Sequence, residues 1–184
     1  MKKDIKPIKQ ETEFGCLSAC YRMIRAYFED GVYEKEDETQ LTSKAFSSET
    51  GFNEHFYLKK LSSSGYKIKV IVETPYMLEG YTQLNTKLNC NIPVEFNLVG
   101  NHDFTKLLDE GYLIITLIDL WSIDMIIHYP HYVIVENFED DSFMIADPKY
   151  CKKIKFSRRR FEKSLEELKY RLGYSPLIFA IKKD

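Results

Sequence analysis

The stretch from Gln10 to Cys20 contains the side chains best suited to covalent chemistry. It reads Gln-Glu-Thr-Glu-Phe-Gly-Cys-Leu-Ser-Ala-Cys, with a glutamine six residues before Cys16. From Leu17 to Phe28 the apolar residues recur every three or four positions, which predicts an amphipathic helix seated on a core. Cys16 would then lie in the first turn, where unpaired N–H groups and the positive end of the helix dipole favour a thiolate. Cys16 is therefore a candidate nucleophile.

A cysteine alone does not establish catalysis, because free cysteines are among the most buried residue types. Thiolate catalysis also needs an imidazole that takes and returns a proton, a group that orients the ring, and donors for an oxyanion. His131 opens one predicted strand and Asp147 ends the next strand of the same predicted hairpin, so pairing brings the two close. Gln10 offers a side-chain amide near the start of the helix. These four residues together predict a cysteine-based catalytic site.

The first half of the chain is predicted to be mainly helical. One helix is predicted over residues 39–48, one capped by Asn53 ends at Gly65, and Thr74 with Pro75 opens another that reaches residue 88. Residues 66–73 alternate polar and apolar side chains, which predicts a strand. Residues 1–90 are therefore interpreted as a mainly helical lobe.

Residues 91–184 are interpreted as a mainly β lobe. No linker or internal repeat separates the halves, so we expect one domain of the α+β class, a helical N-terminal half packed on an antiparallel C-terminal sheet. The acidic turn 139–141 joins the two strands that carry His131 and Asp147. The predicted strands are 94–98, 112–120, 131–138, 142–147, 151–156 and 175–182, and the predicted helices are 103–110 and 157–173.

Composition limits the classes of partner. The 184 residues suit one domain, and 26 basic against 28 acidic side chains give a net charge of −2, which argues against nucleic acid and anionic membranes as partners. The apolar run 112–127 is interrupted by Asp119 and Asp124 and is too short to span a bilayer. The N-terminus shows no secretory signal, so a cytoplasmic location is expected. Four cysteines do not form a disulfide scaffold.

At its two motif regions the chain resembles the papain-like peptidase family that trims double-glycine leader peptides. The resemblance rests on Gln10 and Cys16, on the apolar helix that follows, and on His131-Tyr-Val-Ile-Val and Asp147-Pro148. It implies a papain-like cysteine proteinase fold and a peptide or amide substrate, with no cofactor and no metal. It also implies Cys16 as nucleophile, His131 as general base and acid, Asp147 as its orienting partner and Gln10 as oxyanion donor.

The chain departs from that family on either side of the cysteine. The family usually has an acidic residue before the cysteine and a glycine after it, whereas here Gly15 precedes Cys16 and Leu17 follows. We expect the Leu17 side chain at the floor of the substrate cleft. Familiar members are fused to a membrane transporter, and neither its membrane spans nor its nucleotide-binding loop occurs in this sequence, so a stand-alone peptidase-like protein is expected.

Three functions are compatible with these residues. The first is a hydrolase that cleaves a peptide or amide bond through a thioester on Cys16. The second is an acyl or peptidyl transferase that passes the same thioester to an amine. The third is a peptide- or ligand-binding module that has lost turnover, which Leu17 would favour.

Two further groupings have competing interpretations. Cys16, Cys20, His128 and His131 could be drawn as a four-ligand zinc site, although Cys20 falls on the core stripe of its helix. The apolar segment 121–127 either folds back into the core, or places Trp121 and Ile123 in the acyl-side substrate pocket, or forms a patch for a partner.

Overall fold

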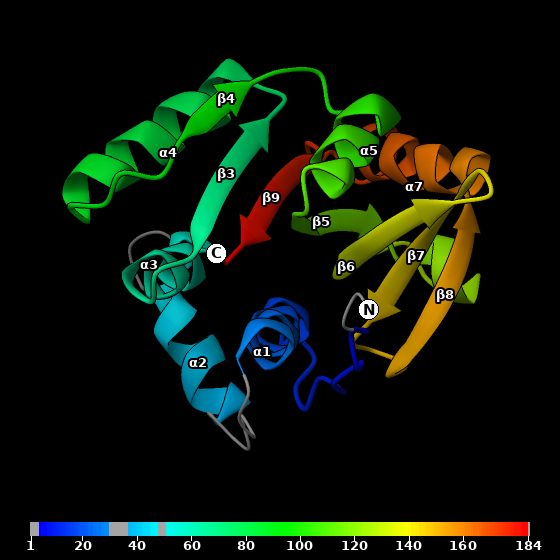
Figure 1. The fold of residues 1–184 in the computed structure, drawn as a ribbon, viewed down its shortest axis with the longest axis horizontal. Helices are drawn as coiled ribbons and strands as arrows, with labels where there is room; N and C mark the ends of the chain where they lie inside the picture. The colour runs from blue at the N-terminus through cyan, green and yellow to red at the C-terminus, as the bar shows by residue number, and fades with distance from the viewer. Residues whose placement is uncertain (1–3, 30–36, 48–50, 184) are drawn as a thin grey trace.

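A seven-stranded sheet runs through the protein (Figure 1). The computed structural model describes residues 4–29, 37–47 and 51–183. The strands of this sheet are β3 (Lys67–Val72), β4 (Val94–Phe96), β5 (Leu113–Asp119), β6 (Pro130–Glu139), β7 (Ser142–Asp147), β8 (Lys152–Ser157) and β9 (Leu177–Lys182). Their order is β4-β3-β9-β5-β6-β7-β8, and neighbours are antiparallel except β3 and β4, which are parallel. A separate short pair is β1 (Phe46–Ser47) and β2 (Gly51–Phe52).

Helices cover both faces of the sheet (Figure 1). They are α1 (Cys16–Phe28), α2 (Glu38–Ala45), α3 (His55–Ser63), α4 (Pro75–Lys87), α5 (Asn101–Asp109), α6 (Trp121–Asp124) and α7 (Arg158–Tyr170). Along β5, Ile115 and Leu117 join the core cluster that contains α1 to α4, whereas Ile114 and Ile118 join the cluster of α5 and α7. All seven residues of β5 are buried, because alternate side chains point into two different cores.

The sheet extends beyond the half of the chain that was predicted to contain it. β3 comes from the first half of the chain, and β9 lies between β3 and β5, with Ile68 opposite Ile181 and Leu113 also opposite Ile181. The strand predicted over residues 66–73 is β3 and joins the sheet of the second half, whereas the parallel β3–β4 pair was not predicted. A strand pattern specifies which face is buried but not which neighbour it pairs with. The C-terminal strand therefore occupies a central place in the sheet that its position in the sequence did not indicate.

Local end signals were predicted more accurately. Asn53 accepts a hydrogen bond from the backbone N–H of His55 at 3.0 Å, and Ser157 accepts one from Arg160 at 3.3 Å, at the starts of α3 and α7. The helix predicted over 39–48 is α2, which ends at Ala45 before β1, and residue 48 lies outside the described residues. Caps depend on a few consecutive residues, which explains why they can be read from the sequence.

Thr74 caps α4, whose first turn forms part of the cavity described below. Its hydroxyl accepts a hydrogen bond from the N–H of Met77 at 3.2 Å. We expect Thr74→Ala to lower the free energy of unfolding by about 1 kcal/mol, because one N–H of the first turn loses its partner. Thr74→Ser keeps the oxygen and should stay close to the wild-type value in urea denaturation. Equal losses in both variants would show that the cap contributes nothing.

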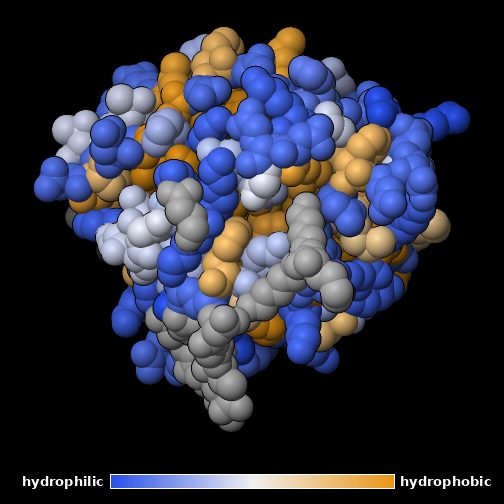
Figure 2. All heavy atoms as spheres, viewed as in Figure 1, coloured by the Kyte–Doolittle hydropathy of each residue, from blue (hydrophilic) through white to orange (hydrophobic). Residues whose placement is uncertain are grey.

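Helix length and surface hydropathy are the features on which a membrane span depends. Within the described ranges, no helix is both long and apolar enough to cross a bilayer. Figure 2 shows hydrophilic residues over most of one face, with apolar residues visible between them near its middle.

Candidate active site

Cys16 begins α1 at an uncapped helix start. The N-cap position is Gly15, which supplies no side-chain hydrogen bond to the first turn. The N–H groups of that turn are therefore open to a thiolate or an oxyanion. Cys16 itself is half-buried and lines a cavity, whereas Ala19 and Cys20 behind it are fully buried. Burial raises the pKa of the Cys20 thiol well above its usual value, aided by the nearby Cys16 and Asp147.

His131 and Asp147 meet at the paired ends of β6 and β7. The ladder pairs Ile134 with Ala146, so the start of β6 lies beside the end of β7. His131 Nε2 lies 2.7 Å from an Asp147 carboxylate oxygen, and the two residues are 3% and 0% exposed. The Asp147 carboxylate also accepts the backbone N–H groups of Lys149 at 3.1 Å and Tyr150 at 3.0 Å. Three hydrogen-bond donors around one buried carboxylate fix its position.

The His131 ring is set up to carry a positive charge beside Cys16. Burial opposes that charge, but hydrogen bonds to Asp147 and Cys16 outweigh it and raise the pKa of His131 to about 9. Asp147 occupies Nε2, which leaves Nδ1 as the ring nitrogen available to the Cys16 thiol. An imidazolium in this position stabilises a neighbouring thiolate and has a proton to give to a leaving group.

Gln10 supports the loop that leads to Cys16. Its backbone N–H donates to the carbonyl of Pro148 at 2.9 Å, directly after Asp147. Its side-chain nitrogen donates to the carbonyls of Thr12 at 2.9 Å and Glu13 at 3.2 Å. The amide that was predicted to stabilise an oxyanion therefore binds its own loop in this structure. An oxyanion role requires Gln10 to release one of those carbonyls.

A fully buried carboxylate, Glu38, holds the same loop from beneath. Glu38 Oε1 accepts the backbone N–H groups of Glu11 at 2.7 Å and Thr12 at 2.9 Å, and the Thr12 hydroxyl at 3.3 Å. Its other oxygen lies 3.4 Å from the guanidinium of Arg22 on α1. Gly15 passes so close that a Cβ there would lie 1.8 Å from Glu38 Oε1. Glu38 thus links α2, α1 and the loop before the nucleophile.

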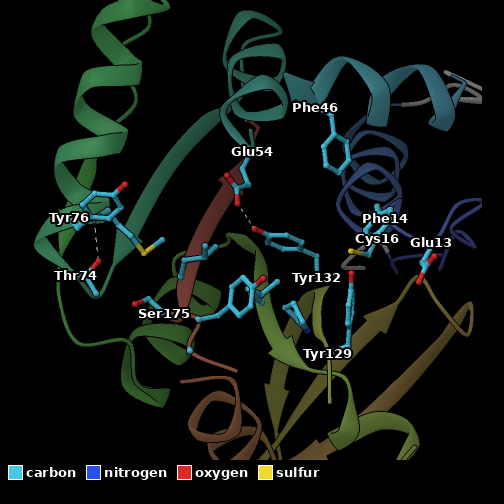
Figure 3. Close-up of a pocket in the computed structure, with 16 residues that line it drawn as sticks. Glu13, Phe14, Cys16, Phe46, Glu54, Thr74, Tyr76, Tyr129, Tyr132 and Ser175 are labelled. Atoms are coloured by element: carbon cyan, nitrogen blue, oxygen red, sulfur yellow. Dashed lines mark hydrogen bonds between the residues drawn. The ribbon is translucent and has the colours of Figure 1, made fainter. Parts of the chain in front are cut away.

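The cavity beside Cys16 has a volume of about 700 Å³. Its wall combines the start of α1 with β6, the start of α4 and the segment before β9 (Figure 3). The ionisable carboxylates on its wall are Glu13 and Glu54. Its aromatic residues are Phe14, Phe46, Tyr76, Tyr129, Tyr132 and Tyr174. The space is large enough for several residues of an extended peptide.

Comparison with known proteins relates the chain to a family of peptidases. Residues 112–168 match the model of the Peptidase C39 family, a span that includes His131 and Asp147 but not Cys16. The chain is C39-like. No curated protein is significantly similar to the C39-like chain in sequence.

Two solved peptidase domains share the fold. One is a double-glycine motif protease from an AMS/PCAT transporter in complex with the leader peptide, with 17% identity, a TM-score of 0.52 and coverage of 98% of this chain and 94% of that one. The other is the peptidase domain of Streptococcus ComA, a bifunctional ABC transporter involved in quorum sensing, with 12% identity, a TM-score of 0.53 and coverage of 98% and 100%. The predicted α+β, papain-like fold class is confirmed.

Three residues predicted to line the substrate pocket lie elsewhere. Leu17 is 1% exposed in the core shared by α1 and the sheet. Trp121 stacks on His128 with ring centroids 4.8 Å apart, and Ile123 packs against the cluster of α5 and α7. None of the three is among the residues that line the cavity. The prediction that Leu17 forms the cleft floor is wrong, because on a helix the residue after Cys16 turns about 100° away, onto the core face.

The segment 121–127 neither folds into the core as a whole nor reaches the cavity. After the short helix α6, Met125 is 68% exposed and Ile126 is 75% exposed. Asp119 closes the loop, since its carboxylate accepts the N–H of Trp121 at 3.2 Å and that of Tyr129 at 3.1 Å. The loop is thus held at its base while its tip remains in solvent.

The zinc site drawn from Cys16, Cys20, His128 and His131 does not form in the C39-like chain. His128 Nδ1 lies 2.6 Å from an Asp119 carboxylate oxygen. In the part of the chain that the structure describes, the one group of three or more possible metal ligands is Asp119, His128 and Glu167. Asp119 is already used to close the loop, and Glu167 pairs with Arg171. These contacts account for the group as part of the scaffold.

Sequence reasoning missed two acidic residues. Glu38 was included in no predicted motif, although it fixes the loop before Cys16. Glu54 was covered by a predicted helix start, yet its carboxylate lines the cavity. No spacing rule connects either residue with Cys16. Glu38 ends a run of charged residues, 34–38, so its type and neighbours give no signal that it is buried.

Proposed function

We propose that this protein is a cysteine peptidase that hydrolyses a peptide bond through a thioester on Cys16. The observation that carries the proposal is the His131 ring, whose Nε2 lies 2.7 Å from the Asp147 carboxylate and which is close enough to Cys16 for that residue to help raise the pKa of the ring. A C39-like sequence match and a peptidase-domain fold support the same chemistry. A solved domain of this fold is in complex with a leader peptide, which supports a peptide as the substrate class here.

The residues suggest an ordered reaction. The Cys16 thiolate attacks the carbonyl carbon, and the N–H groups at the start of α1 bind the oxyanion, joined by Gln10 if its amide turns from the loop. Protonated His131 gives its proton to the leaving amine as the C–N bond breaks. Neutral His131 then takes a proton from water, which attacks the thioester and releases a carboxylate and the Cys16 thiolate.

The alternatives differ in their support. A transferase would use the same thioester, but an amine would attack it in place of water. The molecule that attacks the thioester therefore distinguishes the two functions, whereas the catalytic residues do not. The binding-module alternative drew on Leu17 as an obstacle in the cleft, and that support is lost because Leu17 lies in the core. Hydrolysis is therefore the function we favour.

Brief alkylation with iodoacetamide at pH 6 tests the proposed nucleophile. An ordinary thiol with a pKa of about 8.5 is almost fully protonated at that pH, whereas a thiolate paired with imidazolium remains reactive. We expect Cys16 to react at least about tenfold faster than exposed Cys151, as read by peptide mass spectrometry. His131→Ala should abolish the difference. Equal rates at Cys16 and Cys151 in the wild-type protein would overturn the proposal.

A further inference from the structure

The cavity beside Cys16 is negatively charged and has aromatic walls. Glu13 and Glu54 contribute carboxylates, and among the described residues that line it there is no lysine, arginine or histidine. Six aromatic side chains surround the same space. Aromatic faces attract cations, and this attraction strengthens where water is excluded.

Glu54 has no counter-ion within the described part of the chain. Its carboxylate accepts a hydrogen bond from the Tyr132 hydroxyl at 2.9 Å, and no described cation forms an ion pair with it. His55 follows it directly, but burial lowers the pKa of His55 to about 4, so that ring is neutral. Burial also raises the pKa of Glu54. The ionised form of a buried carboxylate without a counter-ion is stabilised by any cation that binds next to it.

A second polar group at this end of the cavity also lacks a partner. The buried hydroxyl of Tyr81 has no hydrogen-bond partner among the described residues. Tyr81 lines a smaller pocket of about 320 Å³ that shares Glu54, Tyr76 and Met77 with the main cavity. Glu54 and Tyr81 lie close enough that the carboxylate raises the pKa of the Tyr81 hydroxyl further, after burial. A ligand with several N–H donors could donate hydrogen bonds to both the Glu54 carboxylate and the Tyr81 hydroxyl oxygen.

This acidic end belongs to the same cavity as the nucleophile. Tyr132 directly follows His131 in β6, and its ring lies between Glu54 and Cys16 in Figure 3. A peptide held at Cys16 can therefore place one of its side chains beside Glu54 without leaving the cavity.

We propose that Glu54, with the rings of Tyr76 and Tyr132, forms a subsite for the lysine or arginine side chain of a peptide substrate. The inference rests on the proposed peptidase function and adds the charge of the substrate to it. Glu54 is the counter-ion, the two rings are the walls, and the Tyr81 hydroxyl accepts a further N–H bond.

Cleavage profiling on a mixed peptide library tests the subsite, because the library contains basic residues in many sequence contexts. A proteome digested by a glutamate-specific protease gives peptides that keep lysine and arginine in every internal context. We expect the wild-type protein to favour lysine or arginine about tenfold at one fixed position from the cut, equivalent to about 1.4 kcal/mol. Glu54→Gln should remove the preference, whereas the exposed Glu95→Gln should keep it. Acetylating the lysines should remove cleavage at lysine and leave cleavage at arginine.

The contrary outcomes are distinct. Cleavage without a basic preference, or a preference that survives Glu54→Gln, would overturn the subsite while the peptidase function stands. A preference lost in Glu13→Gln but kept in Glu54→Gln would overturn the assignment to Glu54. A reactive Cys16 that cuts none of these peptides would also overturn the subsite, since basic residues are offered in all contexts. An unreactive Cys16 would instead overturn the proposed function. Thermal melting of Glu54→Gln verifies that the variant is folded.

Discussion

Gly15→Ala is expected to lower the free energy of unfolding by about 3–5 kcal/mol and to slow alkylation of Cys16 by roughly a hundredfold. The added Cβ would lie 1.8 Å from Glu38 Oε1 and 2.7 Å from the Thr12 hydroxyl oxygen. Glu38 is fully buried and cannot retreat without losing the backbone N–H groups of Glu11 and Thr12. The loop must therefore move, and with it the start of α1 and the position of Cys16.

A second glycine provides the matched control for this prediction. Gly80 lies inside α4, where a Cβ would meet no atom within 4 Å. Gly80→Ala should raise stability by about 0.5–1 kcal/mol, because alanine favours the helix, and should leave alkylation unchanged. Urea denaturation and iodoacetamide kinetics measure both effects. If Gly15→Ala behaved like Gly80→Ala, the close packing of Glu38 under the loop would be wrong.

The parts of the site that the sequence predicted are those with local signals. The helix rhythm after Gly15 placed Cys16 at the start of α1, and the pattern around the acidic turn placed His131 and Asp147 on paired strands. Hairpin strands pair with their sequence neighbours, so a separation of 16 positions does not hide the contact. The contact between His131 and Asp147 therefore follows from two strands that the sequence pattern already predicted.

The parts that were not predicted depend on distant pairing. Glu38 meets Thr12 across 26 positions and the Tyr132 hydroxyl meets Glu54 across 78, with no periodicity linking either pair. The misplacement of Leu17 has a different origin. The spacing of Leu17, Tyr21 and Ile24 already indicated the core face of α1, but the family resemblance suggested the cleft instead. Here the hydrophobic period was the better guide.

Asp147→Asn is expected to bring the pKa of His131 down from about 9 to near or below its ordinary value of 6.5. Burial disfavours the charged ring, and without the Asp147 carboxylate only the Cys16 interaction opposes it. A fall of about 2.5 units lowers the protonated share of the His131 ring at pH 7 from nearly all molecules to about a quarter. Alkylation of Cys16 at pH 6 to 7 should slow accordingly. NMR titration of the His131 ring measures the pKa directly, and Asp140→Asn in the exposed turn, which should leave it unchanged, is the control.

The same change has a defined effect on stability against pH. In a Cys16→Ala background, which removes the titrating thiol, the raised pKa of His131 means that the folded state holds its proton more tightly than the unfolded state. The resulting stabilisation is fully present below about pH 6.5 and is lost as pH rises through the folded pKa. It amounts to less than about 3 kcal/mol, because each unit of pKa shift contributes about 1.4 kcal/mol and the Cys16 part of the shift is removed in this background. Adding Asp147→Asn should flatten this dependence between pH 6.5 and 9, and an unchanged slope would show that Asp147 does not hold the charge on His131.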